Sequence, residues 1–137
     1  RKTLDCGAEA VLLICACMSR DRLFRLYEAS LRLGLTPLVE THISEELELA
    51  ESLGATVVGI NNRDILSLEK DDGAVDVTGE LAREAPKNAL LISESGIQSP
   101  AEARLAIEAG ADAVLIGTAL WKAPDIEQAY LQFCKGE

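Results

Sequence analysis

Three polar side chains each end or follow an apolar run that is typical of a buried strand. Glu40 ends the run in PLVE, Asn61 follows TVVGI, and Glu94 follows ALLIS. Carboxylates grouped with an amide suit proton transfer or the stabilisation of a cationic intermediate. Taken singly, each residue has a plainer interpretation: a solvated loop residue, a turn former and a turn cap, respectively. Their equivalent positions after successive runs favour one shared site.

Two glycine-containing segments near the C-terminus suggest a phosphate site. ESGI places Gly96 just past the fourth apolar run, and IGTAL places Gly117 and Thr118 past the fifth. Glycine lets backbone N–H groups approach an anion closely, and GTALW can open a short helix whose amino end attracts phosphate. Each segment alone is weak, but two in succession favour the site. GxGxxG, P-loop and nucleophile-elbow motifs are absent from the sequence.

A repeated pattern must position these residues. CGAEAVLLI at 6–14 and AGADAVLIG at 109–117 are nearly the same, with a glycine where a helix would end and an apolar run after it. Such runs suit strands buried on both faces of a parallel sheet. Apolar runs predict strands near residues 10–17, 37–40, 56–60, 89–94 and 113–116, and all but the fourth follow a glycine in this way.

Helical patterns separate these runs. Residues 21–33 place Leu23, Leu26, Tyr27 and Ser30 on one face. Ser44 is the predicted N-cap of a helix over 44–53, and SPAE predicts a capping box between Ser99 and Glu102 at the start of 99–109. Weaker patterns predict helices near 75–85 and over 124–134, the latter starting at Pro124.

Alternating strands and helices imply right-handed crossovers and a parallel sheet with helices outside it. A chain of 137 residues is one domain's worth. Five strands fit an open doubly wound sheet or part of an eight-stranded (β/α)₈ barrel, and in both the functional residues lie at the carboxyl ends of the strands.

The amino-acid composition argues against several classes of binding partner. The net charge of −10 should repel nucleic acid and anionic membranes. No apolar run reaches the roughly 18–20 residues of a membrane span, and RKTLDCG lacks a signal-peptide pattern. With four cysteines and His42 as the sole histidine, we expect no metal site. A reduced, intracellular protein is the plain interpretation of the cysteines.

The segments PLVETH, GINNRD, LISESGI and DAVLIGTALW together resemble indole-3-glycerol-phosphate synthase, a (β/α)₈-barrel enzyme of tryptophan biosynthesis. The resemblance runs through essentially the whole chain and matches the C-terminal part of the enzyme, from barrel strand 4 to helix 8. It implies an α/β fold of TIM-barrel type, a single partial barrel over 1–137 with about five βα units. The family closes the indole ring of 1-(o-carboxyphenylamino)-1-deoxyribulose 5-phosphate with decarboxylation and dehydration, without a cofactor. The resemblance also implies an enzyme of the cytoplasm, or of the plastid if the protein comes from a plant.

The resemblance also implies roles for individual residues. Glu40 would take part in proton transfer, Asn61 would orient the substrate and a catalytic group, and Glu94 would stabilise positive charge on the ring nitrogen. Arg63 would lie near the substrate carboxylate, with Ser95 beside Glu94. The phosphate cradle would comprise Gly96, Gly117 and Thr118, the last often Ser in the family. Asn62 and Asp64 would shape the loop.

One departure is large: the family's catalytic lysines and another glutamate lie on strands 1 to 3, which this sequence does not match. Lys2 precedes the first predicted strand by too few residues to replace them. Five parallel strands cannot close such a barrel, and open edges invite association. We expect negligible synthase activity from the chain alone. We also expect that it pairs with an N-terminal half-barrel, self-associates through the sheet edges, or is a truncated product that lost its front half.

Two other functions remain open. One is another phosphate-binding barrel enzyme, thiazole-synthase-like or a sugar-phosphate isomerase, because GADAVLIGTAL occurs loosely in many of these. GINNRD does not, and no strand end carries the Schiff-base lysine of a thiazole synthase. The other is a non-catalytic half-barrel that binds phosphate or assembles with partners. Sizing the protein and titrating it with a substrate analogue would discriminate between them.

Overall fold

A computed structural model of the chain describes residues 2–63 and 75–135. Within these ranges a single sheet contains five parallel strands in sequential order. The strands are β1 (Ala10–Ile14), β2 (Thr36–Thr41), β3 (Val57–Asn61), β4 (Leu90–Glu94) and β5 (Ala113–Leu115). A doubly wound sheet reverses its strand order at a switch point, whereas each strand here lies beside its successor. The order confirms the predicted partial (β/α)₈ barrel.

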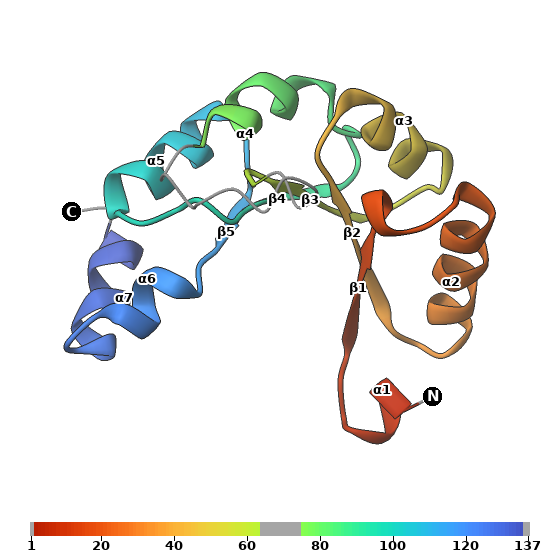
Figure 1. Cartoon of the computed structure of the whole chain (residues 1–137), viewed down its shortest axis with the longest axis horizontal. Helices are drawn as coiled ribbons and strands as arrows, with labels where there is room; N and C mark the ends of the chain where they lie inside the picture. The colour runs from red at the N-terminus through yellow and green to blue at the C-terminus, as the bar shows by residue number, and fades with distance from the viewer. Residues whose placement is uncertain (1, 64–74, 136–137) are drawn as a thin grey trace.

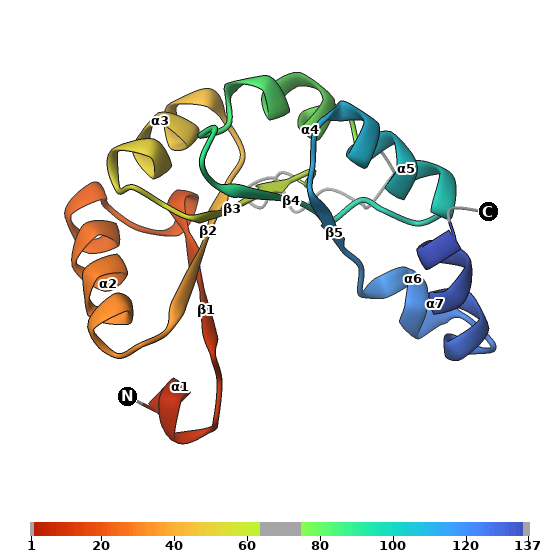
Figure 2. The same cartoon turned by 180° about the vertical axis from the view of Figure 1, so that it is seen from behind.

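Helices cover the outer, convex side of this curved sheet, so that the described chain forms an open arc (Figure 1). Viewed from behind, α1 and β1 lie at one end of the arc, and α6 and α7 lie at the other (Figure 2). The α-helices are α1 (Lys2–Asp5), α2 (Arg20–Arg32), α3 (Ser44–Ser52), α4 (Asp76–Leu81), α5 (Pro100–Ala109), α6 (Thr118–Lys122) and α7 (Ile126–Lys135). Short 3₁₀ segments follow β1 at Cys15–Cys17 and α4 at Ala82–Glu84.

The two faces of the sheet differ in burial. Successive residues of a strand point to opposite faces, and the register aligns Leu13, Val39, Val58 and Leu91 on the helix side, where all four are buried. On the concave side, Leu12 is 46% exposed and Leu115 is 51% exposed. The prediction of strands buried on both faces is therefore wrong for β1 and β5, because helices cover only the convex face of the described chain.

Most helix signals in the sequence are confirmed, with shifts at the ends. The capping box is present: Ser99 Oγ accepts the Glu102 N–H at 3.3 Å, and Glu102 Oε2 accepts the Ser99 N–H at 2.8 Å. Ser44 is not an N-cap, because α3 is capped one residue earlier, at Ile43. Glu46 instead accepts the backbone N–H of His42 at 2.6 Å, which satisfies a donor just before the helix.

Other boundaries also differ from the prediction. The first strand ends at Ile14, because residues 15–17 turn into a 3₁₀ segment that buries Cys15 and exposes Cys17. The last helix begins at Ile126, where Asp125 Oδ1 accepts the Gln128 N–H at 2.9 Å, so the cap is Asp125 and Pro124 lies outside.

On α2, Leu23, Tyr27 and Ser30 are buried as predicted, but Leu26 is exposed. At 3.6 residues per turn, Leu26 falls at the margin of that buried stripe. Its exposed position corrects the expectation that all four residues contribute to the core.

Candidate functional site

Glu40, Asn61 and Glu94 share the concave face at the carboxyl ends of three neighbouring strands. The register pairs Glu40 with Gly59 and Asn61 with Glu94. Because Gly59 and Asn61 are two residues apart on β3, both positions point to the same face. The structure therefore brings together the three side chains that the sequence placed at equivalent strand ends.

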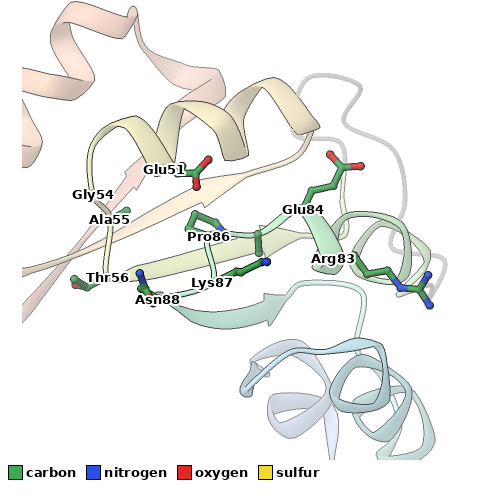
Figure 3. Close-up of a pocket in the computed structure, with 10 residues that line it drawn as sticks. Glu51, Gly54, Ala55, Thr56, Arg83, Glu84, Pro86, Lys87 and Asn88 are labelled. Carbon is green, nitrogen blue, oxygen red and sulfur yellow. The ribbon is translucent and has the colours of Figure 1, made fainter.

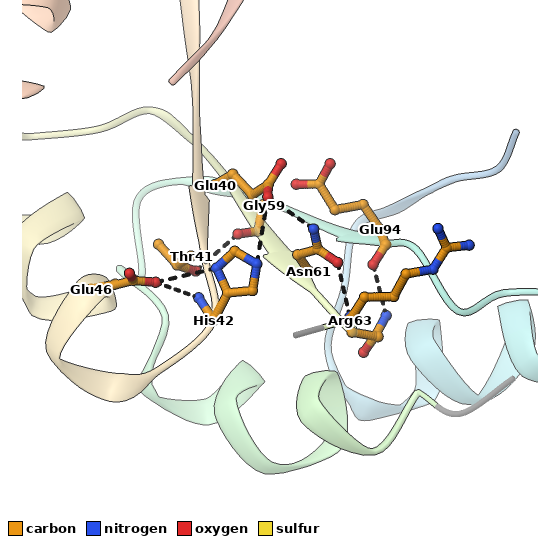
Figure 4. A network of polar contacts seen from close by, with 9 residues as sticks. Glu40, Thr41, His42, Glu46, Gly59, Asn61, Arg63 and Glu94 are labelled. Atoms are coloured by element: carbon orange, nitrogen blue, oxygen red, sulfur yellow. Dashed lines mark hydrogen bonds and ion pairs between the residues drawn. The ribbon is translucent and has the colours of Figure 1, made fainter. Parts of the chain in front are cut away.

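Asn61 bridges the first carboxylate to the following loop. Its Nδ2 donates to Glu40 Oε1 at 2.9 Å, and its Oδ1 accepts the backbone N–H of Arg63 at 2.9 Å (Figure 4). Glu40, Asn61 and Glu94 are 4%, 8% and 5% exposed. These values exclude a solvated Glu40, and Asn61 and Glu94 lie within β3 and β4 rather than in turns. The bond from the Arg63 N–H to Asn61 Oδ1 is that of an Asx turn, so Asn61 also shapes the loop, as its plainer interpretation proposed.

Glu94 has an unusual electrostatic environment. Its Oε1 is buried and accepts no hydrogen bond from any residue that the structure describes. Burial, followed by the negative charge of Glu40, raises the pKa of Glu94 from 4.5 to about 7, and His42 partly opposes this. The two carboxyl groups point toward one another in Figure 4. A carboxyl group with a pKa near neutrality can exchange a proton at physiological pH. A nearby positive charge lowers that pKa and so favours the ionised form.

His42 lies between two carboxylates that come from different elements. Its Nε2 is 3.5 Å from Glu40 Oε1, and its Nδ1 is 3.4 Å from Glu46 Oε2 in the first turn of α3. The ring thus links the start of α3 to Glu40 (Figure 4). Sequence reasoning weighed His42 only as a metal ligand and missed this role; the signal was its spacing, two residues after one glutamate and four before another.

The binding residues expected from the sequence line one cavity of about 180 Å³. Its wall comes from the loops after β3, β4 and β5, and includes Arg63, Ser95, Gly96, Gly117 and Thr118. The predicted short helix opens at Thr118, with Gly117 as its cap residue. Leu115 and Ile97 add apolar surface to this cavity. A small polar group and an apolar ring could therefore be held side by side.

A larger depression of about 640 Å³ lies at the opposite end of β3 and β4 (Figure 3). It is lined by the turns before these strands, with Glu51, Thr56, Arg83 and Lys87 among its residues. In (β/α)₈ barrels the amino-terminal ends of the strands serve stability, whereas reactive groups lie at the carboxyl ends. We therefore place the functional site at the smaller cavity.

Asn62 holds the loops of this site together. Its side-chain amide donates to Ser93 Oγ, Glu94 O and Ser95 O at 3.0, 3.1 and 3.0 Å. Its Oδ1 accepts the backbone N–H and the hydroxyl of Thr78 at 3.0 and 2.9 Å. Thr78 Oγ1 and Ser93 Oγ are 2.7 Å apart and both side chains are buried, which completes a ring of hydrogen bonds.

This ring fixes a strained segment. Ser95 has a φ of 64°, a left-handed conformation that costs a non-glycine residue about 1–2 kcal/mol, and its carbonyl is held by Asn62. The loop role predicted for Asn62 is thus supported by its contacts. Sequence reasoning missed Thr78 and Ser93, although Ser93 stands out as a polar residue in an apolar run. Asp64, the other predicted loop residue, lies outside the described residues.

Known proteins match the chain along most of its length. Residues 1–133 match the family described as Indole-3-glycerol phosphate synthase. The Indole-3-glycerol phosphate synthase of Pyrococcus abyssi is 42% identical over 136 residues, which cover 99% of this chain and 58% of that protein. The enzyme of the same name from Thermococcus kodakarensis is 45% identical over 127 residues, 93% of this chain and 55% of that protein. The "Multifunctional tryptophan biosynthesis protein" of Schizosaccharomyces pombe is 44% identical over 119 residues, 87% of this chain and 15% of that protein.

The chain belongs to the indole-3-glycerol phosphate synthase family. It spans between half and three fifths of the length of the two archaeal synthases. Solved structures agree on the fold: a 3-hexulose-6-phosphate synthase superposes with a TM-score of 0.80 at 15% identity, over 98% of this chain and 65% of that one. Thiamine phosphate pyrophosphorylase from Pyrococcus furiosus gives a TM-score of 0.73 at 18% identity, over 98% of this chain and 61% of that one.

Membership of the synthase family argues against the thiazole-synthase-like alternative. Within residues 2–63 and 75–135, no cluster of three His, Cys, Asp or Glu side chains could hold a metal ion. In the same ranges no helix is long and apolar enough to cross a membrane.

Asn62→Asp should destabilise the protein by about 2–5 kcal/mol, since it removes the donors that face two carbonyls and a hydroxyl and places a carboxylate oxygen against them. Asn62→Ala should have a similar effect. Urea unfolding measures both. Asn88→Ala, at an exposed position, is the matched control and should change the stability by less than about 0.5 kcal/mol. Equal effects at the two positions would contradict the role given to Asn62.

The raised pKa of Glu94 predicts a pH-dependent stability. Between pH 4.5 and about 7 the unfolded chain loses the Glu94 proton while the folded chain keeps it. The stabilising contribution is therefore complete below pH 4.5 and is lost as the pH rises to about 7, by up to about 3 kcal/mol. Denaturant unfolding at a series of pH values measures it. Glu94→Gln should remove this component, and a variant with an unchanged pH profile would argue against a buried carboxyl.

Proposed function

We propose that this chain is the carboxyl-terminal part of an indole-3-glycerol phosphate synthase barrel and supplies one side of its active site. The observation that carries the proposal is the buried cluster of Glu40, Asn61 and Glu94 on the concave face, together with the cavity lined by the loops after β3, β4 and β5. The substrate is a phosphorylated anilino sugar that carries an aromatic carboxylate, and the reaction releases CO₂ and water as the indole ring closes.

The two glutamates have different roles in this proposal. Glu40 transfers a proton, and its carboxylate is oriented by Asn61 on one side and His42 on the other. Glu94 stabilises the positive charge that develops on the ring nitrogen. A nearby cation lowers the pKa of a carboxyl group, so Glu94 would ionise as that charge appears. The attraction between the Glu94 carboxylate and the charged ring nitrogen is therefore stronger in the transition state than in the substrate complex.

Binding groups on the same cavity complement the rest of the substrate. Arg63 would attract the aromatic carboxylate, and Ser95 would donate a hydrogen bond beside Glu94. The bare backbone at Gly96 and Gly117, with the Thr118 hydroxyl, would hold the phosphate. All of these except Glu94 itself line the one cavity, which supports their joint role in a single ligand site.

We further propose that a separate set of βα units completes the barrel. Both edge strands, β1 and β5, have one unpaired side within the described sheet, and exposed apolar side chains occur on the concave face and on α6, where Trp121 is 81% exposed. The family's catalytic lysines would come from those added units. The chain alone would then bind a phosphorylated ligand weakly and would turn over no substrate. Its free cysteines suit the reducing cytoplasm.

Mixing tests this proposal. The segment of the Pyrococcus abyssi synthase that this chain does not match should restore the formation of indole-3-glycerol phosphate, followed by fluorescence, when it is refolded with this chain. Neither piece alone should be active. In the reconstituted barrel Glu40→Gln should lower the rate by about 100- to 10,000-fold, while Glu51→Gln, in the depression at the far end, should leave it unchanged. Activity from the 137-residue chain by itself would refute the proposal that the active site is divided between this chain and a separate set of βα units.

A further inference from the structure

Gly59 lies at the centre of the polar cluster, in the middle of β3. Its partner on β2 is Glu40 and its partner on β4 is Ile92. A methyl group built on its Cα would overlap Glu94 Oε1 and would lie 3.0 Å from Glu94 Cδ. The carboxyl group of Glu94 therefore occupies the space that a side chain at position 59 would fill.

Backbone conformation does not explain a glycine at this position. Gly59 is absent from the residues with positive φ, so β3 is ordinary extended backbone there, which any residue adopts. Its carbonyl accepts the Thr41 hydroxyl at 2.9 Å, but every amino acid supplies a carbonyl. Glycine inside a strand weakens it and marks a close approach of another group. The approaching group here is the Glu94 carboxyl.

We propose that Gly59 is a positioning residue, whose bare backbone lets the Glu94 carboxyl lie across β3 and point toward Glu40. The third-nearest atom to the added methyl is Leu38 Cδ1 at 3.4 Å, an ordinary van der Waals distance. Any side chain at position 59 would push Glu94 off this seat and away from Glu40. The effect of Gly59 on catalysis rests on the proposed function, whereas its effect on the position of the Glu94 carboxyl does not.

The seat accounts for the burial of Glu94. Lying over β3 with Leu38 beside it, the carboxyl is removed from water and close to a second negative charge, which are the two causes of its raised pKa. A carboxyl displaced toward the open concave side would regain water. The absence of a side chain at Gly59 thus affects the protonation of Glu94 on the neighbouring strand β4.

A double-mutant cycle tests the seating without any substrate. The effect of Gly59→Ala on stability should differ between the unchanged chain and a Glu94→Ala background, where the overlapping atoms are gone. Gly79→Ala is the matched control, because a methyl group there meets nothing within 4 Å. If Gly59→Ala fails to fold, the double variant should still fold. An equal change in stability in both backgrounds would overturn the proposal.

The titration of Glu94 separates positioning from a merely structural role. Carbon-13 NMR of the side-chain carboxyl should give a midpoint near 7 in the unchanged chain and in Gly79→Ala, and a midpoint shifted toward 4.5 in Gly59→Ala. An unshifted midpoint in a folded Gly59→Ala variant would overturn the proposal. In the reconstituted barrel the same substitution should lower kcat by about 100-fold. Failure of reconstitution would count against the proposed function and leave the titration and the cycle intact.

Discussion

The in-register pairing of β2, β3 and β4 is the constraint on which the site depends. It aligns Glu40 with Gly59 and Asn61 with Glu94, so that four positions on three strands meet on the concave face. Slipping one strand by a single residue would turn its polar residues toward the helices and its apolar residues outward. The buried set on the convex side, which includes Val39, Val58, Ile60 and Leu91, prevents that slip. The apolar core thus fixes the position of the reactive groups.

Burying two carboxyl groups side by side is destabilising, and only one of the two is compensated by polar contacts. Glu40 accepts a hydrogen bond from Asn61 and lies beside His42, while Glu94 Oε1 accepts none from the described residues. An unmatched buried acceptor is destabilising, and such residues cluster at functional sites. Under the proposed function, the unpaired Glu94 carboxyl oxygen stabilises the positive charge that develops on the reacting substrate. The Asn62 ring then holds the loops rigid around it.

Much of this arrangement could be predicted from the sequence, because its signals are local. Glycine followed by an apolar run located four of the five strands, the apolar run ALLIS located β4, and SPAE located the start of α5. Contacts between distant elements could not be predicted in the same way. Nothing near Gly59 in the sequence indicates that Glu94 covers it, and the bond from Thr78 to Asn62 depends on how α4 folds back over the sheet. Ser44 is the first residue of α3 rather than its N-cap, because the helix begins one residue earlier than the sequence pattern predicts.

The most direct measurement is a carbon- and nitrogen-resolved NMR titration of the chain with indole-3-glycerol phosphate at millimolar concentration. All proposed phosphate contacts belong to this chain and line one cavity. The account predicts chemical-shift changes at the amides of Gly96, Gly117 and Thr118 and at the Glu94 carboxyl. Changes confined to the depression around Glu51 and Lys87, or no changes at the three amides, would contradict it.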